Sequence, residues 1–537
     1  MRRLAALVLA SGATRMGQAR AADPYDVVEQ SIPQLQADLA AGKVTTEGLV
    51  RAYEARIAAV DRSGPSLNSV IALNPHALAD ARQSDAERRA GRLRGPLHGV
   101  PVLIKDNIES ADGAATTAGS LALAENVTGR DAPVVRRLAD AGAIILGKTN
   151  LSEWANIRSG GSISGWSAVG GLVKNPYVLD RGASGSSSGT GAAIAASLAA
   201  AGVGTETDGS VTAPASVNGL VGLKPTVGLV SRTHVVPISH SQDTPGPMTR
   251  SVEDAAILLT AMAGSDPADP ATAPADAHKA DYAAGLSGAR LKGKRLGVLT
   301  YAAAGFSPAV DALFAGAVVK LRDEGAEVIE LKDFQPPDNL RAQEFTVLLT
   351  ELKADLNAYL ASTPTTVKTR TLADVIAVNQ ATPRELALFG QETFERAEAT
   401  TGLADPDYVT ARSDSQRAAG PDGIDKLVAE HHLDALIAPA YGPAARIDWG
   451  AGGGGQGGRA SSLAAVAGYP NLVVPMGQVR GLPVGIAFLG PAWSEARLLQ
   501  IGYAFEQATH ARQPPAYIPS LESTPEFLEA TAPVRAN

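Results

Sequence analysis

The stretch from Arg181 to Pro225 reads RGASGSSSGTGAAIAASLAAAGVGTETDGSVTAPASVNGLVGLKP. Small residues dominate it: a Gly/Ser run comes first, an Ala-rich apolar segment follows, and a second Gly/Ser turn holds Ser210. Glycine and serine suit places where a backbone bends sharply or lets a ligand come close. Because an Ala-rich run favours a tightly packed helix, which would fix one turn against the other, the stretch predicts a built site and not a flexible linker.

The composition around this stretch is that of a folded protein. The chain has 537 residues, of which 45% are hydrophobic and 19% charged, so it could hold two to four average domains or one large core. Its formal net charge of −8 argues against nucleic acid as a main partner, because phosphate binding needs a basic face. The absence of cysteine excludes thiol catalysis, disulfides and Cys-ligated metals.

The N-terminal segment resembles an export signal. MRRLAALVLASGATRMGQARAADP begins with two arginines after the initial Met, continues with the apolar run Leu4–Ala10, and has small residues before Ala22. This pattern predicts a signal peptide over residues 1–22, cleaved near Ala21 or Ala22, and hence a periplasmic or secreted protein. A disordered leader that is not cleaved is the alternative. No other stretch approaches the roughly 18–20 apolar residues of a membrane span, so no membrane association is expected.

Short apolar runs alternate with amphipathic segments along the rest of the chain. Strands are predicted over Leu67–Ala72, Val100–Ile104, Ala143–Leu146, Lys294–Leu299, Ala326–Leu331, Leu433–Ala438, Leu472–Pro475 and Val484–Leu489. Helices are predicted over Ala77–Ala90, Pro133–Ala141, Ser251–Ala263, Ser307–Glu324 and Ser494–Thr509. The pattern indicates the α/β class, with a large mixed, mostly parallel sheet and helices on both faces. Residues 23–537 are predicted to form a single domain, in which 340–430 is a mainly helical cap region.

Four segments are predicted to be irregular. The glycine-rich region Ser159–Gly171 is expected to lie close to the site, and Val235–Met248 is expected to be a loop. Ser265–Gly285, rich in Asp, Pro and Ala, is predicted to be a surface linker. Gly450–Gly458 is predicted to be a flexible loop that is either a linker or a mobile wall of the pocket.

One possible chemistry is that of an α/β-hydrolase. The segment Gly185–Gly189 fits the G-x-S-x-G nucleophile elbow, with Ser187 as nucleophile and His431, His432 or His510 as base. The elbow needs a strand immediately before it, and the preceding residues do not read as one. A phosphate-binding loop is weaker, because no Gly-Lys-Ser/Thr follows the glycines. The histidines show no metal-ligand spacing, so no metal is predicted.

A second constellation joins Lys105, Ser186 and Ser210. Serine is a poor nucleophile unless a neighbour takes its proton. Lysine can do so only when neutral, which requires its pKa to fall well below ~10.4. Burial at the end of a strand, beside an uncharged Gly/Ser pocket, lowers the pKa by desolvation. Because a hydroxyl both donates and accepts, a serine between lysine and nucleophile can relay the proton.

The turn Thr207-Asp208-Gly209-Ser210 is the candidate oxyanion hole. Its successive backbone N–H groups can point at the developing oxyanion, and the loss of one such donor typically costs ~10²–10³ in rate. The alternative is that Lys105 is a surface lysine and that both turns contribute to packing without a catalytic role. Neither reading requires a cofactor.

Several strings along the chain resemble one known family. GVPVLIKDNI, GKTNLSEWA, the Gly/Ser run, GLKPTVGLVS, SQDTPGPM and AGYPNLVVPMG…GLPVGIAFLGP occur in this order and are similar to the amidase signature family over nearly the whole chain after the leader. The resemblance implies Ser210 as nucleophile, Ser186 as a bridging serine preceded by a cis peptide, and Lys105 as the catalytic lysine. It also implies Ser187 as a supporting hydroxyl and 207–210 as the oxyanion loop.

Two positions depart from the family pattern. Asp208 stands where the family often has Gly, and Thr212 stands where it often has Arg. Without that Arg, a substrate carboxylate near the scissile amide is disfavoured, as are the glutamine-amidotransferase subunits that feed ammonia to a partner. No obligatory protein partner is therefore expected.

Two further strings narrow the expected substrate. TETDGS and ELKADLNAYL (Glu351–Leu360) resemble the peptide amidase branch, which removes the C-terminal amide from peptide amides. The resemblance thus implies a serine amide hydrolase that produces a free acid and ammonia. The alternatives are an amidase for small aryl or aliphatic amides and a catalytically silent binding protein on the same fold.

Overall fold

The computed structural model describes residues 25–303, 305–449 and 460–533. The signal peptide predicted at residues 1–22 and the glycine loop Gly450–Gly458 lie outside these ranges, so both stay predictions. Within the described ranges, no helix combines the length and the apolar character needed to cross a membrane.

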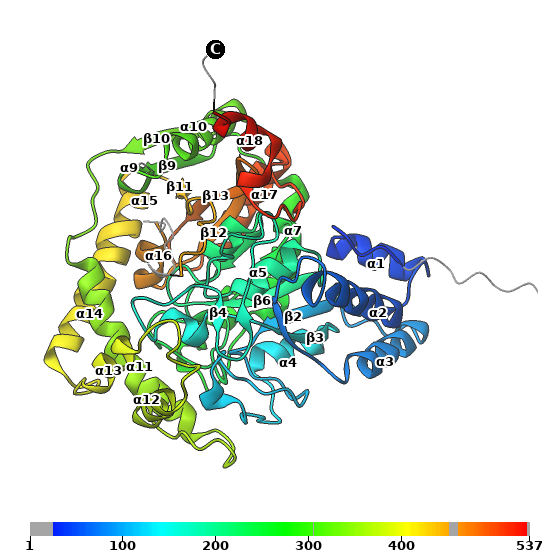
Figure 1. Cartoon of the computed structure of the whole chain (residues 1–537). Helices are drawn as coiled ribbons and strands as arrows, with labels where there is room; N and C mark the ends of the chain where they lie inside the picture. The colour runs from blue at the N-terminus through cyan, green and yellow to red at the C-terminus, as the bar shows by residue number, and fades with distance from the viewer. Residues whose placement is uncertain (1–24, 304, 450–459, 534–537) are drawn as a thin grey trace, which may run out of the picture.

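An 11-stranded sheet runs through the centre of the described chain (Figure 1). Its strand order is β1-β3-β2-β6-β8-β7-β12-β13-β11-β9-β10, and β4 and β5 form a separate two-stranded sheet. The strands of the large sheet are β1 Val70–Leu73, β2 Pro101–Lys105, β3 Ile144–Thr149, β6 Ala201–Glu206, β7 Val221–Lys224, β8 Thr244–Thr249, β9 Arg295–Leu299, β10 Glu327–Leu331, β11 Ala435–Pro439, β12 Asn471–Val479 and β13 Leu482–Leu489. The small sheet contains β4 Trp166–Ser167 and β5 Gly171–Leu172.

The sheet is mixed, as predicted, but parallel pairing is less prevalent than we expected. Among the described strands, β2 pairs in parallel with β3 and β6, and β9 pairs in parallel with β10 and β11. The other six pairings of the large sheet are antiparallel. One cause is the hairpin β12–β13, whose two turn residues Arg480 and Gly481 both have positive φ, the geometry of a tight two-residue turn.

Strand β8 corrects the prediction of a loop over Val235–Met248. Its sequence TPGPMT contains two prolines, which are rare in strands inside a sheet because they lack an N–H group. Pro245 and Pro247 occupy alternate positions, so both missing donors would point to the same edge of the strand. The remaining N–H groups can then serve the opposite edge, where β8 pairs with β6 along five residues.

Helices cover both faces of the sheet, as predicted. The helices are α1 Ile32–Ala40, α2 Thr46–Arg56, α3 Ala77–Arg89, α4 Pro133–Asp140, α5 Ser188–Ala195, α6 Thr212–Val217, α7 Val252–Met262, α8 Ala275–His278, α9 Thr300–Ala303, α10 Pro308–Asp323, α11 Leu340–Ala361, α12 Leu372–Ala381, α13 Glu392–Glu398, α14 Pro406–Ala419, α15 Lys426–Glu430, α16 Ser461–Ala467, α17 Glu495–Thr509 and α18 Pro525–Thr531. Leu472 of β12 lies against Gly502 of α17. The next residue, Val473, lies against Gly485, beside Ser216 of α6. Since successive side chains of a strand alternate in direction, α17 and α6 lie on opposite faces.

The acidic segment Ser265–Gly285 is packed against the molecule and is not a free linker. Asp269 is buried and pairs with the Arg232 guanidinium at 2.5 Å. Asp266 accepts a hydrogen bond from the Ser231 hydroxyl at 2.7 Å. These contacts fix the chain that leads from β7 to β8.

The region 340–430 is helical, comprising α11 to α15, and Figure 1 shows α11, α12, α13 and α14 together at one side of the sheet. A hydrophobic cluster joins these helices to the core, with Leu356 and Phe394 packed near Trp154. Trp154 belongs to the segment that leads into the glycine-rich region Ser159–Gly171. The helices are therefore placed beside the segment that leads into the glycine-rich region.

The Ala-rich run of the central stretch forms helix α5 and then strand β6. All eight residues of α5 are buried. A Cβ atom at Gly189 would lie 2.4 Å from the backbone oxygens of both Asn150 and Ser69, so this position requires glycine. Close packing at α5 therefore explains the small residues, and it brings the start of α5 next to the carboxyl ends of β2 and β6.

Candidate active site

Lys105 is the last residue of β2 and is fully buried. Its Nζ atom lies 2.7 Å from the Oγ of Ser186 and 2.9 Å from the Oγ1 of Thr205. The surface-lysine alternative is therefore wrong: the strand end places the amine against the Gly/Ser run.

Burial changes the ionisation of this amine. Desolvation lowers the pKa of Lys105 to about 7, although the negative charges of Asp243 and Glu206 act in the opposite direction. A large fraction of Lys105 is thus neutral near pH 7, and a neutral amine can accept a proton.

Ser186 and Ser187 stand at the start of α5. The peptide bond between Gly185 and Ser186 is cis. Ser187 joins the two turns of the central stretch: its Oγ donates to the Thr205 carbonyl at 3.1 Å, and its N–H donates to the Ser210 carbonyl at 3.1 Å. Ser187 therefore occupies the supporting position that the resemblance implied.

The nucleophile elbow finds no support in this geometry. Ser187 is fully buried, and its hydroxyl is engaged with both backbone groups of Thr205. Within the described residues, no hydrogen bond links Ser187 to His431, His432 or His510. The α/β-hydrolase alternative thus lacks its base.

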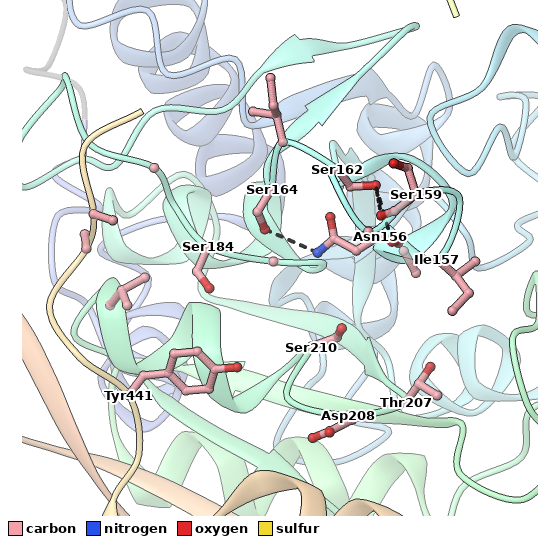
Figure 2. Close-up of a pocket in the computed structure, with 18 of the residues that line it drawn as sticks. Asn156, Ile157, Ser159, Ser162, Ser164, Ser184, Thr207, Asp208, Ser210 and Tyr441 are labelled. Carbon is pink, nitrogen blue, oxygen red and sulfur yellow. Dashed lines mark hydrogen bonds between the residues drawn. The ribbon is translucent and has the colours of Figure 1, made fainter. Parts of the chain in front are cut away.

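Ser210 lies in the turn that follows β6. Gly209 has φ +81°, in the left-handed region that favours glycine. The Ser210 side chain is largely buried, yet it contributes to the wall of a cavity together with Thr207 and Asp208. Figure 2 shows these three residues along one side of the cavity, across from Asn156.

The cavity has a volume of about 430 Å³. The glycine-rich segment 159–164 forms one wall, which confirms that part of Ser159–Gly171 lies at the site, and Tyr441–Ile447 forms another. Among the described residues that line it, Asp208 and Arg446 carry the only charged side chains. The cavity therefore offers a mostly uncharged surface next to Ser210.

Thr205 and Asn107 belong to the buried network around Lys105; the sequence marks the cluster 105–107 at a strand end as a place for functional groups, but it gives no sign of Thr205. Thr205 Oγ1 accepts one hydrogen bond from the Asn107 amide at 2.9 Å and another from Lys105 Nζ at 2.9 Å. Asn107 lies two residues after Lys105, in the sequence Lys-Asp-Asn at the end of β2. Thr205 lies inside β6, and only the pairing of β6 with β2 brings it to the lysine.

Asp243 is another residue that sequence reasoning missed. Its carboxylate accepts from the Thr207 hydroxyl at 2.6 Å and from the backbone N–H groups of Ile238 and Ser239. Burial raises the pKa of Asp243 to about 6. Asp243 thus supports the candidate oxyanion loop from the side of the chain before β8.

The departure at Asp208 has a structural partner. Its carboxyl group accepts from the Ser462 hydroxyl of α16 at 2.6 Å. Burial raises the pKa of Asp208 above its usual range. Thr212 stands where the family often has Arg, and its N–H and hydroxyl donate to Glu206. This position therefore carries no positive charge.

His240, Glu351 and Asp355 are close enough together to ligate a metal ion. The spacing of histidines in the sequence did not reveal this group, because the loop before β8 and helix α11 meet only in the fold. We assign the three side chains to ion pairs, because the two nitrogens of His240 already contact the two carboxylates.

Comparisons with known proteins identify the family of this chain. A family model described as Amidase matches residues 48–499. The structure of native peptide amidase from Stenotrophomonas maltophilia is 52% identical, covers 92% of this chain and 100% of its own, and superimposes with a TM-score of 0.86. An Arabidopsis thaliana protein named as a probable amidase is 40% identical over 96% of both chains. One of the subunits of the glutamyl-tRNA(Gln) amidotransferase of Pseudomonas syringae pv. syringae is 34% identical over 91% of this chain and 100% of its own.

The family match spans most of the chain, and the similar chains are covered almost completely. The predicted fold and the predicted family are therefore confirmed together. This protein belongs to the amidase signature family and is an amide-hydrolysing enzyme.

Proposed function

We propose that the enzyme removes the C-terminal amide of peptide amides, with Ser210 as nucleophile and with Ser186 and Lys105 as its proton relay. The observation that carries the catalytic part is the buried contact of 2.7 Å between Lys105 Nζ and Ser186 Oγ. The pKa of about 7 at Lys105 supports its role as the final proton acceptor.

In the first half of the reaction, Ser210 Oγ attacks the amide carbonyl carbon and its proton passes through Ser186 to Lys105. The N–H groups of residues 207–210 stabilise the negative charge on the carbonyl oxygen. The relay then returns the proton to the leaving nitrogen, the C–N bond breaks and ammonia departs, which leaves an ester on Ser210.

In the second half, water attacks this ester and the same groups act in reverse. Lys105 takes a proton from the water through Ser186, and Ser210 recovers a proton when the acid leaves. The proton transfers use only Ser210, Ser186 and Lys105, while the N–H groups of residues 207–210 stabilise the negative charge on the carbonyl oxygen.

Three features support a peptide amide as substrate. The cavity beside Ser210 has a volume of about 430 Å³, is walled by the segments 159–164 and 441–447, and has few charged side chains. At position 212 a threonine bonded to Glu206 replaces the arginine that would favour a substrate carboxylate. The similarity to peptide amidase at 52% identity points to the same substrate class.

The substrate proposal is tested by ammonia release from a panel measured with the purified chain alone. The panel contains an N-acetylated tetrapeptide amide, the same peptide as a free acid, benzamide and a short aliphatic amide. We expect kcat/KM for the peptide amide to exceed that for benzamide by at least about tenfold, because contacts along the cavity add binding energy in the transition state.

The free-acid peptide is the control for hydrolysis of the internal peptide bonds of the substrate, and it should stay intact. A higher kcat/KM for benzamide or the aliphatic amide would overturn the peptide amide proposal and favour the small-amide alternative. Hydrolysis that requires an added protein partner would contradict our proposal that the chain acts alone.

A further inference from the structure

Helix α11 holds the segment that leads into β8. This segment, the 238–243 loop, has the sequence ISHSQD. Three acidic residues of α11 contact it: Glu344 accepts from Gln242, Glu351 accepts from serines of the loop, and Asp355 contacts His240. Two of these acids belong to the ELKADLNAYL string, which the catalytic proposal does not use.

Glu351 is fully buried and collects donors from the loop. Its carboxylate accepts from the hydroxyls of Ser239 and Ser241 and from the Ser241 N–H group. The Tyr408 hydroxyl of α14 donates to it at 2.7 Å. The 238–243 loop is thus anchored to the helical region by one buried carboxylate.

His240 bridges the two carboxylates. Its Nδ1 lies 2.9 Å from Asp355 and its Nε2 lies 3.2 Å from Glu351. An imidazole ring can donate from both nitrogens only when it is protonated. The ring is about one-third exposed, so bulk pH can reach it.

The other charges around His240 include two arginines, and one of these, Arg232, is itself paired with Asp269 at 2.5 Å. Arg412 of α14 lies 3.6 Å from Glu351, and the Arg232 guanidinium donates to the His240 carbonyl. The two carboxylates oppose these cations, and the hydrogen bond to Asp355 is the largest influence, so the pKa of His240 lies above its ordinary value. The contacts with the two carboxylates therefore favour the charged form of the ring.

The opposite end of the 238–243 loop holds the candidate oxyanion loop. Asp243 accepts from the Thr207 hydroxyl at 2.6 Å. Gln242 donates to the Thr207 carbonyl at 3.4 Å and to Glu344 at 3.0 Å. Thr207 is thus held at both its side chain and its backbone by neighbours of His240.

We propose that His240, Glu351 and Asp355 form an ionic latch that positions Thr207, and that the latch opens when His240 loses its proton. The inference rests on the proposed role of residues 207–210 as the oxyanion loop. His240, Glu351 and Asp355 are positioning residues, since they reach the reaction through the 238–243 loop and Thr207.

The latch predicts a loss of activity on the alkaline side. Below the pKa of His240 the ring is charged and bridges both carboxylates. As pH rises through that pKa, one donor is lost, the 238–243 loop loosens and kcat falls. Asp355→Asn removes an anion beside the ring and lowers the pKa of His240, so the decline in kcat should begin at lower pH.

The test compares the pH profiles of kcat for wild type, Asp355→Asn, His240→Gln and the control His234→Gln. His234 lies in the same stretch of chain but contacts Glu109, with 3.9 Å between its Nδ1 atom and a carboxylate oxygen. We expect His240→Gln to lower kcat about tenfold, because small displacements of catalytic groups are costly, and to remove the part of the alkaline decline that His240 causes. His234→Gln should follow the wild-type profile.

Coincident profiles for wild type, Asp355→Asn and His240→Gln would overturn the latch. A gain in activity or in melting temperature on adding Zn²⁺, abolished by EDTA and absent in His240→Gln, would also overturn it in favour of a metal site. An independent readout is an NMR titration of selectively labelled histidines, with the His240 signal identified by its absence in His240→Gln. Its pKa should fall in Asp355→Asn, and an unchanged pKa would contradict the ionic bridge.

Ser210→Ala separates this inference from the catalytic proposal. If Ser210→Ala is inactive while the latch variants behave as wild type, the latch is wrong and the catalytic assignment stands. If Ser210→Ala retains activity, the catalytic assignment is wrong and the oxyanion role of Thr207 falls with it.

Discussion

The Nζ atom of Lys105 and the Oγ atom of Ser186 lie 2.7 Å apart, and both residues are fully buried. They are separated by 81 residues in the chain and meet because β2 ends beside the start of α5. Since burial lowers the pKa of Lys105 to about 7, this contact joins a hydroxyl to an amine that is able to accept its proton.

The ionisation of Lys105 predicts how activity responds to acid. A lysine that acts as proton acceptor must be neutral, so kcat/KM should rise as pH increases through about 7 and should fall tenfold per pH unit well below it. The measurement is a kcat/KM profile for an amide whose own groups do not titrate between pH 5 and 9. A profile that is flat through this range would show that Lys105 does not supply the base.

The relay predicts strong coupling between its members. Lys105→Ala and Ser186→Ala should each reduce kcat by about 10⁴-fold or more, because each breaks the only proposed route for the Ser210 proton. The double variant should be little worse than either single variant. Losses that multiply would contradict a shared relay. Circular dichroism and melting temperature provide the control for folding.

Two glycines, one in the central stretch and one in α10, predict a matched pair of stability effects. Gly189→Ala places a Cβ 2.4 Å from two backbone oxygens, so it should lower the free energy of unfolding severely or prevent folding. Gly316→Ala, in the exposed part of α10, meets nothing within 4 Å. It should raise the free energy of unfolding by about 0.5–1 kcal/mol, because alanine favours helix. Denaturant unfolding measures both, and equal effects would contradict the packing account of α5.

The contacts of Arg158 join the helical region to the cavity wall, so a change at Arg158 should affect both stability and substrate binding. The side chain is fully buried, contacts Glu153 and Glu385 at 3.0 and 3.4 Å, and stacks over the Phe389 ring. Arg158→Met leaves Glu385 unpaired in the interior and should cost about 3–5 kcal/mol of stability. Because Arg158 precedes the glycine-rich wall, KM should rise more than kcat falls.

The exposed Arg417 provides the control for this substitution. It pairs with Asp414 at 2.8 Å on the surface, where ion pairs contribute little. Arg417→Met should change stability by less than about 0.5 kcal/mol. Similar losses in both variants would show that the buried cluster does not anchor the wall.

The sequence allowed the prediction of those parts of the site that lie in local patterns. Lys105 ends an apolar run, and Ser186 and Ser210 sit in Gly/Ser turns on either side of an Ala-rich segment. Their residue types suggested a site, and the resemblance to the amidase signature family implied which serines belong to it. Thr205 and Asp243 could not be predicted in the same way. Their roles come from the pairing of β6 with β2 and from the path of the chain before β8, which are tertiary relationships.

The fold likewise has parts that local sequence patterns predict and parts that depend on tertiary contacts. The strands β9 and β10 and the helix between them follow from apolar periodicity, and they pair in parallel as predicted. The segment that contains strand β8 was predicted to be a loop. Pro245 and Pro247 disfavour a strand, but their alternate placement is compatible with the pairing to β6. The orientation of the central strands depends on partners distant in sequence, so the preference for antiparallel pairing could not be deduced.

The most direct measurement of the central claim is the position of the covalent label after reaction with a fluorophosphonate probe. Peptide mapping by mass spectrometry should find the phosphonyl group on Ser210, and Ser210→Ala should remain unlabelled while keeping the wild-type fold. A label on Ser187, or a fully active enzyme that the probe does not modify, would contradict the assignment of Ser210 as the nucleophile served by Ser186 and Lys105.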